Sequence, residues 1–235
     1  MTVDLDTAKL VLVVSFVLAA LIVCEWTPIF SPFIGRKVLH ISSSFALCIV
    51  GYPMSTMTRS AAAILILGIV GKSCLGLMNR VRKPGTSRID WGIFLYGVSC
   101  LAITLMNVPF HGLYPLFYAD PLAALTGCYV KAKLDREDHE RTVPGSIVFF
   151  VVSLSWALWL MILLDDPSVW LVAMSITEAS VLTLLERTSG KADNLTLAVA
   201  GHAFFISVNT SHVGLMVGTQ ALIVTACHTF SKLAV

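Results

Sequence analysis

One carboxylate stands alone in the middle of an apolar segment. Asp120 lies in the run Leu116–Gly127, which holds no other charged residue. An ionised side chain inside a membrane helix costs roughly 2.5–3.5 kcal/mol on insertion scales, so such a residue usually faces a cavity and has a function. Pro121 follows it and predicts a kinked helix with freed carbonyl groups. A polar contact between two helices is the alternative interpretation.

More carboxylates follow in the carboxyl-terminal half. Glu178 and Glu186 lie eight residues apart and therefore share one helical face to within about 80°. Asp193 and Asn194 open the next apolar segment, where an ordinary helix cap is the alternative.

Basic residues offer the complementary charge. Arg36 and Lys37 precede His40 by four and three positions, so the three share a helical face. Contact with lipid headgroups is the simpler interpretation of such a group.

A charged loop between two apolar segments provides further candidates. It contains Lys131 and Arg141, and it ends in Thr142, Gly145 and Ser146. The amide groups at the start of the following helix are expected to be able to hold an anion, although a solvated loop is the default.

Carboxylates together with phosphate oxygens are the ligands that Mg²⁺ prefers. Cations and helix starts are what phosphates prefer. The combination predicts that the protein handles a nucleotide at a membrane face.

The elements that must position these residues are membrane helices. The chain of 235 residues is 57% hydrophobic and 13% charged, with a mean hydropathy of +0.84. Long apolar runs without strand-like alternation predict an all-α, polytopic bundle formed by a single domain over residues 1–235. The predicted spans, about nine in number, cover about 8–25, 38–55, 60–78, 91–108, 112–130, 145–164, 168–186, 195–210 and 213–231.

Charge placement predicts the orientation. Most basic residues fall in loops on one side of these spans, which puts the amino terminus outside and the carboxyl terminus in the cytoplasm. The first segment lacks a basic leader and a cleavage site, so it is expected to stay as an anchor, and a bacterial inner membrane is favoured. A net charge of +2 gives no reason to expect nucleic acid.

Four blocks resemble motifs of the polyprenol kinase family, which includes phytol kinase and dolichol kinase. Arg36–His40 resembles its RKxxH block, and Ala119–Gly127 resembles its DPxAxxxG block. Arg141–Ser146 is similar to its KTxEGS block. Glu186 with Asp193–Thr196 resembles its Glu followed by DNLT.

The resemblance implies a kinase that transfers the γ-phosphoryl group of CTP to a membrane isoprenoid alcohol such as phytol, farnesol, geranylgeraniol or a dolichol-like compound. It implies a motif-bearing core over residues 36–199, Mg²⁺ as cofactor, and the lipid bilayer, the alcohol and the nucleotide as partners. The expected catalytic residues are Asp120 and His40. The expected metal ligands are Asp120, Glu186, Asp193 and Asn194. The expected nucleotide-binding residues are Arg36, Lys37, Gly127, Lys131, Arg141, Thr142, Gly145 and Ser146.

The chain departs from the family pattern in places. Arg141 stands where a Lys is usual and Pro144 where a Glu is usual, and a second Gly before Lys131 is missing. Three alternatives therefore stay open: a CTP-dependent lipid cytidylyltransferase, a transporter that uses Asp120 and Glu178, and a catalytically silent member of the family.

Overall fold

The computed structural model describes residues 5–50, 53–75, 77, 90–133, 142–163, 169–188 and 193–210. Every regular element within these ranges is a helix, which confirms the predicted all-α class. The helices fall into two compact units that divide after Phe110.

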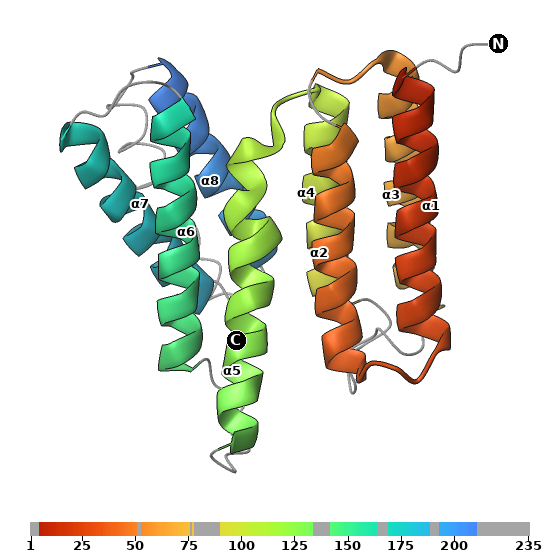
Figure 1. Cartoon of the computed structure of the whole chain (residues 1–235), viewed down its shortest axis with the longest axis horizontal. Helices are drawn as coiled ribbons and strands as arrows, with labels where there is room; N and C mark the ends of the chain where they lie inside the picture. Colours follow the sequence, from red (N-terminus) through yellow and green to blue (C-terminus); the bar gives the residue numbers. More distant parts are fainter. Residues whose placement is uncertain are drawn as a thin grey trace. The chain divides into compact units, whose positions relative to one another are not determined.

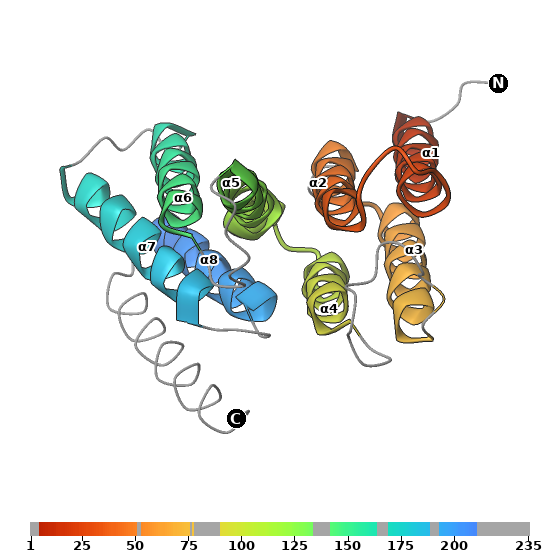
Figure 2. The same cartoon turned by 90° about the horizontal axis from the view of Figure 1, so that it is seen from below.

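The first unit is a group of four helices (Figure 1). They are α1 (Leu5–Trp26), α2 (Pro32–Val50), α3 (Thr56–Cys74) and α4 (Trp91–Met106). Helix α1 packs on α2 and on α3, and α3 packs on α4, as the end-on view in Figure 2 also shows. Cys24 and Leu39 form a small buried cluster between α1 and α2, and Ile93 of α4 packs against it.

The second unit begins with two short irregular helices, the 3₁₀-helix η1 (Phe110–Leu113) and the π-helix η2 (Pro115–Ala119). The α-helices that follow are α5 (Asp120–Lys133), α6 (Val143–Leu163), α7 (Val169–Thr188) and α8 (Asp193–Thr210). Helix α6 packs between α5 and α7, and α8 packs on α7 and on η2.

Short polar side chains mark where several helices begin. The Ser31 hydroxyl accepts the Ile34 N–H at 3.3 Å, and the Ser55 hydroxyl accepts the Thr58 N–H at 3.2 Å. Asp90 and Thr142 cap α4 and α6 in the same way. Each cap satisfies an amide that has no partner inside its own helix.

The helices overlap the predicted spans that fall in the described residues, and α3 lies four residues earlier than predicted. Helix α2 also begins earlier than predicted. This helix begins at Pro32 rather than near residue 38, because Ser31 caps it and Pro32 suits the first helical position. Arg36 and Lys37, expected in a loop, therefore lie in the second turn of the helix. The predicted span at 213–231 lies outside the described residues.

The irregularity expected near Pro121 is present and takes the form of a π-helix. Asp120 donates its N–H to the Pro115 carbonyl, and regular α-helix begins at Asp120. Wide turns of this kind often accompany functional sites.

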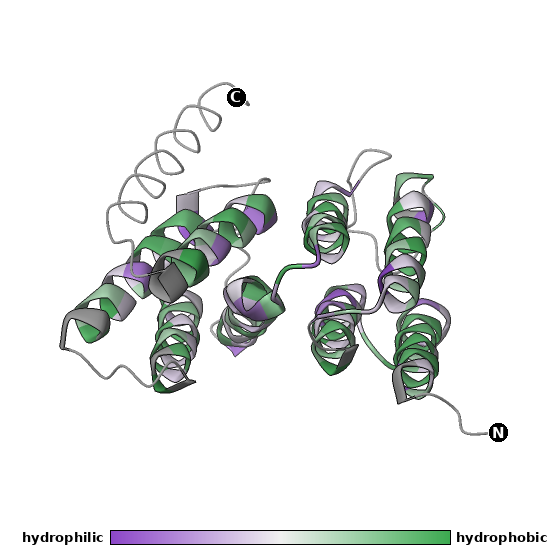
Figure 3. Cartoon of the chain, turned by 90° about the horizontal axis from the view of Figure 1, so that it is seen from above, coloured by the Kyte–Doolittle hydropathy of each residue, from purple (hydrophilic) through white to green (hydrophobic). Residues whose placement is uncertain are grey.

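Among the residues that the structure describes, two helical segments are long and apolar enough to cross a membrane, Thr7–Trp26 and Val143–Leu160. Only 17% and 33% of these segments are buried inside the structure, so most of their apolar surface faces outward. Figure 3 shows hydrophobic residues along most helical turns. These features indicate association with a membrane.

Glycines allow very close packing in the second unit. A side chain added at Gly201 of α8 would collide with the backbone carbonyl of Gly112. A side chain added at Gly112 would come within 2.6 Å of the His202 Cα atom. The backbones of η1 and α8 are therefore in direct contact.

Gly201→Ala is expected to destabilise the protein by about 1–3 kcal/mol, because neither backbone can move away cheaply. Gly68→Ala is the matched control, since a side chain there meets no atom within 4 Å and alanine favours the helix by about 0.5–1 kcal/mol. Thermal unfolding in detergent measures both. Equal midpoints for the two variants would contradict the close contact.

Candidate functional site

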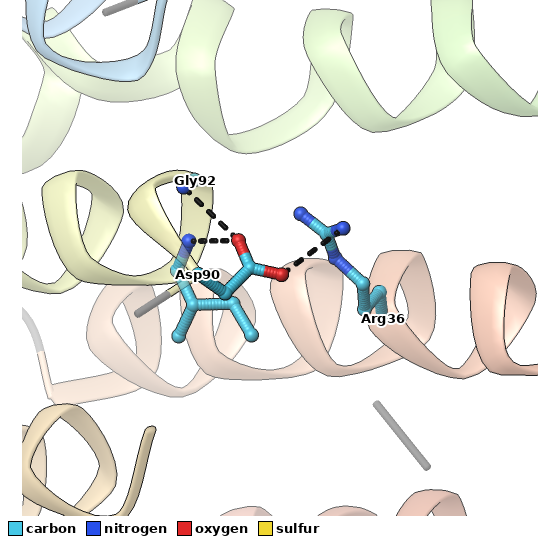
Figure 4. Close-up of polar contacts among 4 residues, drawn as sticks. Arg36, Asp90 and Gly92 are labelled. Atoms are coloured by element: carbon cyan, nitrogen blue, oxygen red, sulfur yellow. Dashed lines mark hydrogen bonds and ion pairs between the residues drawn. The ribbon is translucent and has the colours of Figure 1, made fainter. Parts of the chain in front are cut away.

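Arg36 is held by an ion pair in the first unit. Its Nη1 lies 3.3 Å from Oδ2 of Asp90, whose residue is only 4% exposed (Figure 4). The other oxygen of Asp90 accepts the N–H groups of Gly92 at 3.0 Å and Ile93 at 3.3 Å. Lys37 follows Arg36 on α2 and is half-buried.

His40 lies one turn further along α2, against an aromatic ring. The centroids of the His40 and Tyr96 rings are 4.0 Å apart. The Tyr96 hydroxyl lies 2.9 Å from the hydroxyls of both Ser43 and Ser44, and each serine also donates to the His40 carbonyl. The imidazole is therefore packed beside a small network of hydroxyl groups.

Asp120 is 8% exposed and begins α5, directly after the π-helix. Gly127 lies seven positions further on, which places both residues on nearly the same face of the helix. Ala123 and Gly127 contact the start of α6, because an added side chain at Gly145 would come within 2.9 Å of the Ala123 carbonyl. One at Gly127 would come within 3.0 Å of the Thr142 hydroxyl. The structure thus brings two of the four sequence blocks together.

The helix start at α6 differs from the expectation in one respect. The Gly145 N–H donates to the Thr142 hydroxyl at 3.1 Å, and the Ser146 N–H donates to the Thr142 carbonyl at 3.0 Å. Both amides were expected to be open to an anion. Because the Thr142 cap uses them, a phosphate bound here must displace the cap or rely on side chains.

Contacts between the start of the second unit and α8 show that the two segments run in opposite directions. The rings of His111 and Phe205 lie 5.6 Å apart, Gly112 contacts His202, and Pro115 contacts Gly201. These contacts place η1 and η2 beside the later turns of α8, whose first turn begins at Asp193.

That first turn carries the predicted metal ligands Asp193 and Asn194. Asp193 is the first residue of α8, and its side chain accepts the N–H of the next residue, Asn194, at 2.7 Å. A helix cap accepts an amide two or three residues further on, so the cap that the sequence offered as an alternative stays a prediction. Asn194 is 8% exposed, as is Glu186 in the last turn of α7. Only four residues separate the end of α7 from the start of α8. The three residues therefore occupy neighbouring helix ends.

No three His, Cys, Asp or Glu side chains in the described ranges form a group ready to hold a metal ion. Mg²⁺ usually takes one or two carboxylates from a protein and completes its shell with phosphates and water. Asp120 and Glu186 are buried carboxylates and therefore have the chemistry of such ligands.

The remaining predicted residues are less informative. Lys131 lies in the last turn of α5 and is half-buried. Arg141 lies outside the described residues.

Sequence reasoning missed two residues that contact the candidate site. Asp90 stands directly before an apolar run, which is a recognisable cap signal. Its pairing with Arg36 has no signal in the sequence. Tyr96 lies inside an apolar run and carries no signal at all.

No family model, no curated protein and no solved structure matches this chain. The resemblance to polyprenol kinases therefore depends on the four sequence blocks and stays a prediction.

Two substitutions of Thr142 distinguish the hydrogen bond of its hydroxyl from the volume of its side chain. Thr142→Ala is expected to cost about 0.5–2 kcal/mol of stability and to speed hydrogen exchange at the Gly145 amide. Thr142→Ser keeps the hydroxyl and should behave like wild type in both measurements. Unchanged exchange in the alanine variant would show that the cap contributes nothing.

Proposed function

We propose that the protein is a membrane kinase that phosphorylates an isoprenoid alcohol with a nucleoside triphosphate as donor. The observation that carries the proposal is the buried Asp120, which shares a helical face with Gly127 against the start of α6. Asp193 and Asn194 lie at the start of α8, the helix that packs on η2 directly before Asp120. These elements come from three of the four blocks that resemble the kinase family.

The membrane arrangement belongs to the same proposal. We infer about nine spans, with the amino terminus outside. Large apolar residues are exposed on many helices, including Val11 at 61%, Ile64 at 70% and Ile162 at 77%, and lipid is the environment that suits them. Lys72 lies in the last turn of α3. With alternating spans, that turn faces the same side as Arg36, Lys131 and Arg187, which favours a cytoplasmic location for that side.

Phosphoryl transfer depends on positioning and charge neutralisation more than on covalent chemistry by the protein. The alcohol oxygen forms a bond to the γ-phosphorus while the bond to the β-γ bridging oxygen breaks. A nucleoside diphosphate leaves, and the hydroxyl proton passes to a base. Asp120 and His40 are the two candidates for that base, and a bilayer lets the alcohol enter from the side.

Mg²⁺, when bound, neutralises charge on the β- and γ-phosphates. Asp120, with Asp193 or Asn194, is proposed to hold it, and Glu186 lies on the neighbouring helix end. Basic side chains at helix ends, Arg36, Lys37, Lys131 and Arg141, are proposed to attract the phosphates. The preference for CTP comes from the family resemblance alone.

A transporter is the second candidate, and Glu178 favours it. This residue is completely buried in the middle of α7. Buried carboxylates inside membrane helices are typical of ion and proton paths.

Paired substitutions distinguish these functions, because Asp120 and Glu178 are both buried carboxylates. Asp120→Asn is expected to lower phosphorylation of the alcohol by at least about a hundredfold, whereas Glu178→Gln is expected to keep it within about threefold. A radiolabelled kinase assay measures both, and circular dichroism confirms that each variant folds. Near-normal turnover by Asp120→Asn would contradict the assignment. Nucleotide-independent ion flux in proteoliposomes that is lost in both variants would favour the transporter.

A further inference from the structure

Helix α4 reaches the candidate functional face of α2 at two places. Arg36 and His40 lie one turn apart on α2, and α4 meets the first through Asp90 and the second through Tyr96. Helix α2 packs mainly on α1, and α4 packs mainly on α3. Between α2 and α4, these two polar and aromatic contacts accompany the apolar contact of Ile93 with the Cys24–Leu39 cluster.

Asp90 connects Arg36 to the end of a helix. One carboxylate oxygen accepts two backbone N–H groups at the start of α4, and the other pairs with the guanidinium (Figure 4). The carboxylate is buried, so water competes weakly with these contacts. An arginine fixed in this way loses much of the freedom that its long side chain has in solution.

Tyr96 constrains His40 from a different direction. Its ring packs on the imidazole, and its hydroxyl is fixed by Ser43 and by the completely buried Ser44. The two serines also bond to the His40 carbonyl. The imidazole, the tyrosine ring and this turn of α2 therefore form one connected unit.

We propose that Asp90 and Tyr96 are positioning residues, which orient Arg36 towards the anionic part of the nucleotide and His40 towards the acceptor hydroxyl. Neither residue belongs to the four sequence blocks. The inference depends on the proposed kinase function for the substrates that it names. The orientation of the two side chains can be measured without that function.

The negative charge of Asp90 leads to different expectations for nucleotide affinity and for turnover. An ion pair has no net charge, so Asp90 reduces the attraction of Arg36 for phosphate while it fixes the direction of the guanidinium. Removing only the charge should therefore leave nucleotide affinity equal or better while turnover falls, because poorly aligned groups lose rate rather than binding.

The first test uses two substitutions of Asp90 in the full-length protein in nanodiscs. Asp90→Asn keeps an oxygen that can cap α4, and Asp90→Ala removes both the cap and the charge. In the asparagine variant we expect kcat to fall about tenfold to a hundredfold with an unchanged or lower KM for the nucleotide. Wild-type kcat in Asp90→Asn, together with lower stability only in Asp90→Ala, would reduce Asp90 to a helix cap and overturn its positioning role.

The second test uses Tyr96→Phe, which keeps the ring and removes the hydroxyl. We expect kcat to fall about tenfold and the imidazole NMR signals of His40, assigned through His40→Gln, to shift. Tyr129→Phe is the matched control, because Tyr129 is 68% exposed. Unchanged His40 signals in Tyr96→Phe would overturn the role of Tyr96.

NMR signals of Arg36 and His40 distinguish failure of the kinase proposal from failure of the positioning roles of Asp90 and Tyr96. Absence of any phosphorylated product from folded wild type removes the kinase proposal. The Arg36 guanidinium signals, assigned through Arg36→Lys, are expected to change in Asp90→Asn, and the His40 signals are expected to change in Tyr96→Phe. If both change in a protein without kinase activity, the positioning contacts are confirmed independently of the kinase function. Unchanged signals in both variants overturn the inference whatever the enzyme does.

Discussion

The free-energy cost of a polar group without a partner in apolar surroundings shapes both units of this protein. Asp90 is the clearest case, because one oxygen caps α4 and the other pairs with Arg36. Thr142 satisfies the start of α6 in a related way. Hydroxyl groups within the helices return to a carbonyl four residues earlier, as Thr104 does to Cys100 at 2.7 Å. At Asp90 and Thr142 the polar side chain is satisfied at a helix end, where unpaired backbone amides are available.

Close packing has the complementary role in the second unit. Small residues allow α6 to lie directly on the face of α5 that Asp120 and Gly127 share, and they allow α8 to touch the backbone of η1. A side chain added at Gly127 would crowd Thr142, and one added at Gly201 would collide with the Gly112 carbonyl, so the packed segments would have to shift. The glycines of the sequence blocks thus have a packing role, apart from any role in nucleotide binding.

The sequence predicted the helices well, because long apolar runs leave few alternatives in a chain of this composition. The start of α2 was wrong because Arg36 and Lys37 were interpreted as loop charges, although Ser31 and Pro32 carry a better start signal. The buried position of Asp120 agrees with the expectation from its isolated charge.

One local cap and one long-range ion pair account for what sequence reasoning missed at the site. The amides at Gly145 and Ser146 were expected to be open, but the adjacent Thr142 hydroxyl and carbonyl already accept them. The Arg36–Asp90 pair joins residues that lie far apart in the chain, so no local pattern could reveal it.

The most direct measurement of the central claim is the transfer of label from γ-labelled CTP, with Mg²⁺, to a panel of isoprenoid alcohols by protein in nanodiscs. We predict a labelled lipid monophosphate with release of CDP. Incorporation of α-label with release of pyrophosphate, or no product from folded protein with CTP, UTP, ATP or GTP, would contradict the account.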